Sequence, residues 1–229
     1  MNKRKIILTG SEGVIGKSLI SDFLSIDEVE IICIDQNIGF DLTDEDQVVN
    51  VMKANSDAEY IVNLFAINDH IEKGKKNPNL FEISLDSIKI FCEVNLVALF
   101  SVCRAFVRYT KSPKSILNFS SHYGVRSPKK FIYDNTEKHI GYTITKHGVI
   151  GLTRHLATHL SPVRVNCLAP GGVLHKQDKN FIKKYSENVP LNRMMNASEL
   201  TGLVDLLCSE KSSYITGATI PIDGGWTAW

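Results

Sequence analysis

Short apolar runs alternate along this chain with longer segments in which hydrophobic residues recur every three to four positions. A short run of Ile, Leu and Val residues is typical of a strand that is covered on both faces. Six such strands are predicted, at residues 6–9, 31–35, 61–64, 116–120, 163–168 and 219–222. Their alternation with helices indicates parallel βαβ units, so we predict a three-layer, doubly wound α/β sheet of the Rossmann type.

The predicted helices show their apolar faces clearly. Ile15, Leu19 and Phe23 share one face of a helix that follows the first strand, and a long helix is expected over about residues 85–109. Another helix follows Tyr142. Its apolar face is formed by Val149, Leu152, Leu156 and Leu160.

The length of 229 residues allows one sizeable core but is short for two full domains. We therefore interpret residues 1–229 as a single domain. The two segments with the weakest pattern are residues 122–141 and 173–196. Long unpatterned loops in a compact domain often handle substrates, so these segments are the predicted substrate loops.

Composition excludes several classes of protein. The net charge of +1 gives no global field that favours nucleic acid or a membrane surface. The five cysteines stand singly, without a CxxC pair, so neither a metal cluster nor a disulfide framework is indicated. The N-terminal apolar run is too short for a signal peptide, and no run approaches the roughly 20 residues that span a bilayer. A cytoplasmic protein with reduced thiols is expected.

A glycine-rich turn joins the first predicted strand to the first helix. In a dinucleotide-binding turn, glycines allow the tight bend, the approach of the backbone to a pyrophosphate and the packing of helix on strand. The N-terminus of the helix then offers free N–H groups to the phosphates. An ordinary turn is the alternative. The residues expected to bind the cofactor here are Gly10, Glu12, Gly13, Val14, Ile15 and Gly16.

Asp35 ends the second predicted strand, at the place where a carboxylate accepts hydrogen bonds from a ribose 2′-hydroxyl and repels a 2′-phosphate. It therefore favours NAD over NADP, unless it only terminates the strand. Asp41 and Leu42 are further candidates, near the adenine. Asp41 could instead start a helix, because Asp41-Leu42-Thr43 precedes an acidic first turn.

Several motifs in this order resemble the short-chain dehydrogenase/reductase family over essentially the full length. Besides the glycine turn they are Val94-Asn95-Leu96, Asn118-Phe119-Ser120-Ser121, Tyr142-Thr143-Ile144-Thr145-Lys146, Asn166-Cys167-Leu168-Ala169-Pro170-Gly171-Gly172 and Ile222-Asp223-Gly224-Gly225. The resemblance implies a nicotinamide-dependent oxidoreductase that interconverts a secondary alcohol and a ketone, and a dimer or tetramer. The overall pattern also resembles short-chain reductases found with bacterial surface-glycan and flagellin-modification pathways.

Tyr142 and Lys146 also have an independent physical case, because a spacing of four places both side chains on one helix face. An ammonium beside a phenol favours the phenolate, which would bring the pKa of Tyr142 closer to neutrality and suit it for proton transfer. The resemblance implies that Ser121 steadies the reacting oxygen and that Asn95 supports a proton relay through Lys146. Ser120 could serve in place of Ser121, and Asn95 could be an ordinary polar residue within a helix.

Four departures from the family pattern bear on the site. The glycine spacing TGxxGxxG is more typical of the family's longer sugar-nucleotide enzymes. The usual Asn-Asn-Ala-Gly is here Asn63-Leu64-Phe65-Ala66, an insertion is expected within residues 122–141, and Val173 stands where a threonine is common. Tyr133 has no lysine four residues on, which excludes it as the catalytic tyrosine. The remaining cofactor-binding residues implied by the resemblance are Asn63, Ala66, Pro170, Gly172 and Val173, together with Tyr142 and Lys146 beside the cofactor.

The two predicted substrate loops are more basic than the chain as a whole. Their basic residues are Arg126, Lys129, Lys130, Lys138, Lys176, Lys179, Lys183, Lys184 and Arg193. Basic side chains near a site raise the local concentration of anions, so we expect a polar, anionic substrate such as a sugar or sugar phosphate. Two alternatives remain: an epimerase or dehydratase that uses the nicotinamide transiently, and a non-catalytic nucleotide-sensing protein on the same fold.

Overall fold

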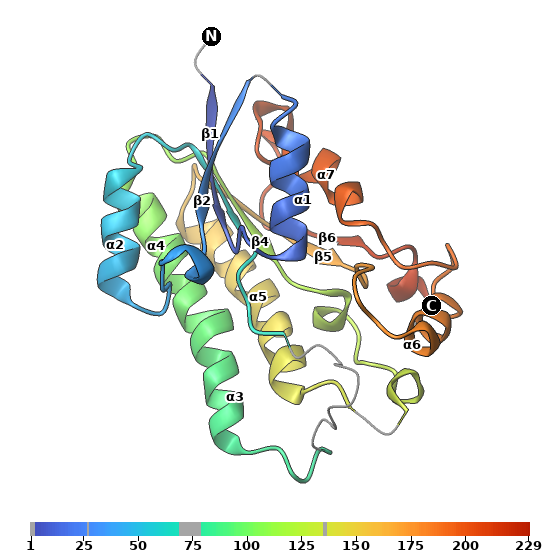
Figure 1. Cartoon of the computed structure of the whole chain (residues 1–229). Helices are drawn as coiled ribbons and strands as arrows, with labels where there is room; N and C mark the ends of the chain where they lie inside the picture. The colour runs from blue at the N-terminus through green and yellow to red at the C-terminus, as the bar shows by residue number, and fades with distance from the viewer. Residues whose placement is uncertain (1–2, 27, 69–78, 135–136) are drawn as a thin grey trace.

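The computed structural model describes residues 3–26, 28–68, 79–134 and 137–229. Its centre is a six-stranded sheet in the order β2-β1-β3-β4-β5-β6, in which every neighbouring pair is parallel. The strands are β1 Arg4–Thr9, β2 Val29–Ile34, β3 Tyr60–Asn63, β4 Ser115–Phe119, β5 Arg164–Pro170 and β6 Thr219–Ile222. All six lie where the apolar runs predict them, and helices cover both faces of the sheet (Figure 1). The predicted three-layer α/β fold is confirmed.

The helices divide into two layers according to which residues of each strand they cover. The α-helices are α1 Val14–Phe23, α2 Glu45–Ala54, α3 Leu85–Cys92, α4 Leu99–Tyr109, α5 Ile140–His159, α6 Lys179–Ser186 and α7 Thr201–Leu207. In β1, Ile7 packs into the core formed with α2, α4 and α5. Its neighbours Ile6 and Leu8 pack into the core formed with α1 and α7. This alternation buries both faces of the strand and explains its uninterrupted apolar sequence.

The predicted helix over residues 85–109 is present, but with a change of winding in the middle. The segment Glu93–Ala98 between α3 and α4 is π-helical, and such segments often occur at functional sites. The sequence pattern predicts no membrane-spanning helix. By length and composition, however, the helix Leu85–Tyr109 is long and apolar enough to cross a bilayer. Of its most apolar stretch, 44% is buried inside the fold. It is therefore in part a core helix of the sheet.

The connection after β2 forms a short 3-10 helix, Gln36–Ile38, and no strand. Asp41 does not start the next helix, which begins at Glu45. Asp44 caps it by accepting hydrogen bonds from the backbone N–H groups of Asp46 and Gln47. The carboxylate of Asp41 accepts hydrogen bonds from Thr43 instead. The helix-start alternative for Asp41 is therefore wrong, because Asp44 is the residue that caps the helix.

Short helical segments organise the two predicted substrate loops. The first contains His122–Gly124 and Lys130–Tyr133, although residues 135 and 136 lie outside the described part. The second contains α6, a helix that was not predicted from the sequence pattern. The 3-10 segment Ala197–Leu200 follows this loop. The last two 3-10 segments are Glu210–Ser212 and Trp226–Ala228. The described parts of the two loops therefore contain regular helical segments.

Candidate active site

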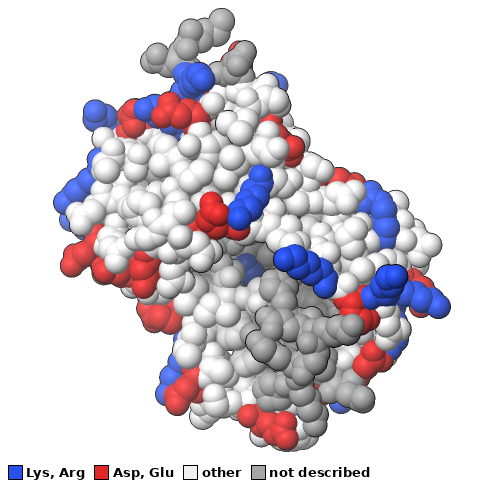
Figure 2. All heavy atoms as spheres, viewed as in Figure 1, with Lys and Arg blue, Asp and Glu red and all other residues white. Residues whose placement is uncertain are grey.

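A cavity of about 610 Å³ opens at the carboxyl edge of the sheet. Its walls come from the turn after β1, the ends of β4 and β5, the first turns of α5, and α6 with its preceding loop. Figure 2 shows the centre of this face hollowed, with basic and acidic side chains around the hollow. Ligands of doubly wound folds bind in this position, and the volume suits a small-molecule site.

The glycine turn forms one wall of the cavity. Gly10 has a φ of +71°, and a Cβ there would lie 2.6 Å from the backbone nitrogen of Phe65. A Cβ on Gly16 would lie 2.5 Å from the carbonyl oxygen of Ser11. Both glycines are therefore required by the protein's own packing. At Gly13 the single near atom is the carbonyl oxygen of Gly10, at 3.3 Å.

The space over Gly13 is a fit test for the dinucleotide. Gly13 is exposed and stands at the N-cap of α1, with no side chain to cap the first turn. The predicted residues Gly10, Val14, Ile15 and Gly16 line the cavity with it. The N–H groups of this helix N-terminus have no side-chain cap, and Gly13 has no side chain that would block a ligand. Both features fit a pyrophosphate. The residues present therefore fit a dinucleotide at this wall.

Asp35 lies behind the glycine turn and does not line the cavity. Its two carboxylate oxygens accept hydrogen bonds from the backbone N–H of Glu12 at 3.0 Å and of Asn37 at 2.9 Å. The side chain of Glu12 pairs with Lys17, at 3.0 Å. Asp35 is 9% exposed. Each of its oxygens keeps a second lone pair that could accept from a ligand hydroxyl.

Two other predicted cofactor residues, Leu42 and Asn63, are used inside the protein. Leu42 is buried in the core beneath α2. The amide of Asn63 donates to the side chain of Asn118 at 3.0 Å and its oxygen accepts from Thr9 at 3.2 Å, in the interior of the sheet. Neither these residues nor Asp41 lines the cavity, whereas Ala66 does.

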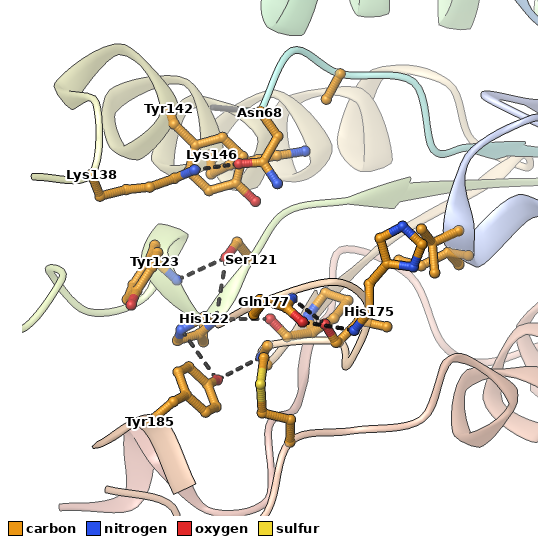
Figure 3. A pocket seen from close by; sticks show the side chains of 18 of the residues that line it. Asn68, Ser121, His122, Tyr123, Lys138, Tyr142, Lys146, His175, Gln177 and Tyr185 are labelled. Carbon is orange, nitrogen blue, oxygen red and sulfur yellow. Dashed lines mark hydrogen bonds between the residues drawn. The ribbon is translucent and has the colours of Figure 1, made fainter. Parts of the chain in front are cut away.

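Ser121, Tyr142 and Lys146 meet at the floor of the cavity (Figure 3). Ser121 follows β4, and the other two project from the first turns of α5 as their spacing predicts. The Nζ atom of Lys146 donates to the carbonyl oxygen of Phe119 at 2.7 Å and lies 5.7 Å from the centre of the Tyr142 ring. The three side chains from two elements converge on one space large enough for a ligand.

The electrostatics differ from the expectation for Tyr142. Desolvation at the cavity wall raises the pKa of its phenol, and a hydrogen bond with Ser121 opposes that rise. Burial also lowers the pKa of the Lys146 ammonium to about 8. The predicted approach of the phenol pKa to neutrality is therefore wrong for the protein alone, because loss of water outweighs the hydrogen bond with Ser121.

The structure separates the roles of the two adjacent serines. Ser120 donates its hydroxyl to the backbone carbonyl of Lys146 at 2.6 Å and so joins β4 to α5. Ser121 accepts from the backbone N–H of Tyr123 at 3.1 Å and faces Tyr142. Of the alternatives left open, Ser121 is the one whose hydroxyl interacts with the phenol.

Asn95 lies in the π-helical segment and supports the site from behind. Its amide accepts from the backbone N–H of Ile67 at 2.8 Å, donates to the carbonyl of Ile67 at 3.1 Å, and donates to Thr145 at 3.1 Å. It is buried and does not line the cavity. Asn95 therefore ties the chain after β3 to α5, next to Lys146.

The turn after β5 forms the opposite wall, with the predicted residues Pro170, Gly172 and Val173 lining the cavity. The backbone N–H of Gly172 donates to the phenol oxygen of Tyr185, on α6, at 2.5 Å. The carbonyl of Val173 accepts from the side chain of Gln177 at 2.8 Å. Helix α6 and its loop are thus bound directly to this turn.

The sequence analysis missed several polar residues that line the cavity. They are Asn68, His122, Tyr123, His175, Gln177, Asn180 and Tyr185. Tyr133, set aside as a catalytic residue, also lines it and donates to the hydroxyl of Tyr123 at 2.6 Å. For His122 and Tyr123, the signal in the sequence was Ser-His-Tyr-Gly directly after a buried strand.

Most basic residues of the two loops do not face the cavity. Among those described, Lys138 is the one that lines it. Its Nζ atom lies 4.2 Å from the centre of the Tyr142 ring and donates to the side chain of Asn68. Lys184 instead pairs with Asp134, and Arg193 pairs with Glu199 at 2.6 Å. Of the basic residues in the two loops, Lys138 is therefore the one in the described part that places positive charge beside the Tyr142 phenol.

The chain matches known proteins over nearly its whole length. A family model described as enoyl-(acyl carrier protein) reductase covers residues 27–227. The chain is 32% identical over 152 residues to post-translational flagellin modification protein A of Campylobacter coli, which covers 64% of this chain and 59% of the relative. It is 35% identical over 144 residues to a 3-oxoacyl-(acyl-carrier-protein) reductase of Aquifex aeolicus, covering 58% and 54%. The chain thus matches somewhat more than half the length of these curated relatives.

Solved structures share the entire fold. A short chain dehydrogenase from Leptospira borgpetersenii with bound NAD+ superposes with a TM-score of 0.84 at 29% sequence identity, covering 99% of this chain and 94% of that one. A short chain dehydrogenase family protein from Francisella tularensis superposes with a TM-score of 0.79 at 25% identity, covering 99% and 100%. Other structures of the same fold are named as complexes with NADPH and with NADH.

Proposed function

Because the chain belongs to the short-chain dehydrogenase/reductase family, we propose that it transfers hydride between a nicotinamide cofactor and a secondary alcohol or ketone. The observation that carries the proposal is the convergence of Ser121, Tyr142 and Lys146 at the floor of one cavity. The glycine turn and the Pro170–Gly172 turn flank them, on either side of the space that a dinucleotide would occupy. When bound, the nicotinamide supplies or accepts the hydride.

Tyr142 is the proposed acid and base of the reaction. Its raised pKa keeps the phenol protonated in the free protein, which suits it to give a proton to a carbonyl oxygen. Ser121 holds the same oxygen. Lys146, fixed by the carbonyl of Phe119, supplies positive charge behind the phenol and favours the phenolate once the proton has left. Asn95 and Thr145 hold the adjoining turn of α5 in place.

The proposal is tested by titrating the purified protein with NADH and NADPH and then following nicotinamide absorbance with a panel of alcohols and ketones. Saturable binding followed by net oxidation or reduction is the expected result. Conversion of a sugar without net change in NADH would favour an epimerase, which the glycine spacing also suits. Binding of the nucleotide without turnover of any substrate would favour the non-catalytic, nucleotide-sensing alternative.

We expect NADH to bind more tightly than NADPH, because Asp35 places a negative charge beside the ribose position. Replacement Asp35→Asn removes the charge and keeps one acceptor oxygen, which can serve only one of the two backbone N–H groups of Glu12 and Asn37. The ratio of the two dissociation constants should change by about tenfold in favour of NADPH, equivalent to about 1.4 kcal/mol. Fluorescence titration measures both constants. Asp41→Asn, which changes a carboxylate bound to Thr43, is the matched control, and an unchanged ratio in Asp35→Asn would contradict the assignment.

The proposed substrate is polar and carries an anionic group, as in a sugar phosphate. The support is Lys138, whose ammonium lies over the Tyr142 ring within reach of a ligand at the phenol. Asp134 and Asp178 also line the cavity, and Lys184 neutralises the first of them. Competition of one sugar in its neutral and phosphorylated forms tests the charge preference. Equal inhibition by both forms would exclude it.

A homo-oligomer is proposed from an apolar face on the long helix and α5. Ile90, Val97, Phe100 and Ile144 are each between 41% and 56% exposed there. Exposed apolar patches of this kind mark association surfaces. Val97→Glu combined with Phe100→Glu should yield a monomer by light scattering, while Leu24→Glu, at an exposed leucine after α1, should not. An unchanged mass in the double variant would place the contact elsewhere.

A cytoplasmic location is proposed from the state of the cysteines. All five are free thiols, three of them buried, as is usual in a reducing compartment. Fractionation of cells that produce the tagged protein tests this location. Recovery in an oxidising compartment with the thiols paired would overturn it.

A further inference from the structure

A chain of buried hydrogen bonds runs behind Ser121. In Figure 3, Tyr142 lies on one side of Ser121, and His122 with Tyr185 lies on the other. The imidazole Nδ1 of His122 lies 3.1 Å from the carbonyl oxygen of Pro170 and 3.3 Å from the hydroxyl of Ser121. Its Nε2 lies 3.4 Å from the phenol oxygen of Tyr185. His122 therefore contacts the serine, the wall after β5 and helix α6 together.

These partners determine where the protons lie. The carbonyl oxygen of Pro170 can only accept, so Nδ1 of His122 must carry hydrogen. In the neutral ring Nε2 then has a lone pair and accepts the hydroxyl proton of Tyr185. The Tyr185 oxygen in turn accepts the N–H of Gly172 at 2.5 Å. Every donor in this chain has an acceptor when His122 is the neutral Nδ1–H tautomer.

The same assignment fixes the direction of the Ser121 hydroxyl. Its oxygen accepts the N–H of Tyr123 at 3.1 Å and lies close enough to share the Nδ1–H of His122. With both lone pairs directed backwards, the hydroxyl proton remains for the other side, where it meets the phenol of Tyr142. This agrees with the direction of the Ser121 effect on the Tyr142 phenol, since donation to the phenolate stabilises it.

The surroundings hold the imidazole in this state. His122 is 4% exposed, and burial lowers the pKa of its imidazolium to about 4. The Trp226 ring stacks on Tyr185 at 4.6 Å between centroids and meets His122 edge-on at 5.1 Å. Asp223 and Lys138 are the charged groups that act on the ring, in opposite directions. Burial therefore favours the neutral imidazole near neutral pH, and aromatic rings pack around it.

We propose that His122, held by Pro170 and Tyr185, is a positioning residue that makes the Ser121 hydroxyl a donor towards the reacting oxygen. The inference rests on the proposed acid–base role of Tyr142. It also means that helix α6 and the turn after β5 influence the serine through one ring. Among the described residues, no hydrogen bond or ring contact joins His122 directly to Tyr142.

The first test reads the tautomer directly. In protein labelled with 15N-histidine, the nitrogen spectrum of His122 should show the Nδ1–H neutral form throughout pH 6 to 8, a range about two units or more above its pKa. Tyr185→Phe removes a single oxygen and should shift the Nε2 signal while Nδ1–H remains. An Nε2–H tautomer, or a ring that titrates in this range, would overturn the proposal. His122→Leu identifies the signals.

The second test reads the consequence at Tyr142. With 13Cζ-labelled tyrosine, assigned through Tyr142→Phe, the Tyr142 signal should shift in His122→Leu in the same direction as in Ser121→Ala. The double variant should show no further shift, since both changes remove one interaction. His122→Asn should restore the wild-type signal, because an asparagine amide reaches the place of Nδ1 and donates there.

The outcomes separate this inference from the proposed function. An unchanged Tyr142 signal in His122→Leu, or additive shifts in the double variant, would overturn the positioning role. If His122→Leu does not fold, the comparison of His122→Asn with Ser121→Ala decides, because the first should leave the signal in place and the second should move it. Neither measurement uses NADH or a substrate. Failure of the wild-type protein to bind NADH would contradict the proposed function but not the positioning role of His122.

Discussion

Tyr142→Phe should reduce turnover by about two to four orders of magnitude, the range that removal of a positioned acid or base produces. The substitution removes one hydroxyl from the wall of the cavity and leaves the ring in place. Because the phenol is proposed to act on the reacting oxygen, whereas the glycine turn is proposed to bind the pyrophosphate, the affinity for NADH should change little. Steady-state rates with any substrate found in the screen, together with NADH titration, measure both quantities.

A second tyrosine provides the control for this experiment. Tyr109 ends α4, far along the chain from the cavity, and its ring lies beside Lys53 and Arg108. Tyr109→Phe should leave turnover and NADH affinity unchanged. Tyr142→Phe with near-normal turnover would show that another group carries the proton, whereas unchanged biological activity without turnover would return the non-catalytic alternative to consideration.

Gly13→Asp should weaken NADH binding by about 100-fold, or roughly 2.7 kcal/mol, without loss of stability. The new carboxylate would stand where the pyrophosphate is expected and would repel it. Aspartate is also a favourable N-cap, and Gly13 already has an extended φ of −71° that any residue adopts. Thermal unfolding should therefore occur at the same temperature or higher, while titration shows the loss of affinity.

Gly16→Ala is the matched substitution in the same turn. Its Cβ would meet the backbone oxygens of Ser11 and Gly10 at 2.5 and 2.6 Å, and backbone cannot move aside easily. Overpacking of this kind costs about 1–3 kcal/mol, so the free energy of unfolding should fall. Equal loss of stability in Gly13→Asp and Gly16→Ala would contradict the separation of a ligand-facing glycine from a packing glycine.

The sequence predicted the fold well because the strands are buried on both faces. A doubly covered strand such as β3, which is buried at every position, is mostly apolar, and this signal needs no knowledge of its neighbours. Tyr142 and Lys146 were predictable for a similar reason, since a spacing of four on a helix fixes their relative position. Local geometry alone was sufficient in both cases.

Features that depend on distant parts of the chain could not be predicted. The pKa of Tyr142 depends on how much water reaches the cavity wall, which several separate elements decide together. The link from His122 to Tyr185 joins residues 63 positions apart, and neither belongs to a recognisable motif. The charges of Lys184 and Arg193 appeared available in the sequence, but Asp134 and Glu199 pair with them.

The position of β6 at the edge of the sheet has a consequence for the order of folding. The N–H of Gly171 binds the carbonyl oxygen of Ile222 at 2.9 Å, and Trp226 packs on Tyr185. During synthesis the glycine turn and the acid–base residues emerge first, but the wall after β5 lacks its hydrogen bond to Ile222 until β6 has left the ribosome and docked. Parallel pairing between distant segments is a slow step, so the cavity is completed late in folding. Until then the nascent chain cannot gain stability from its cofactor.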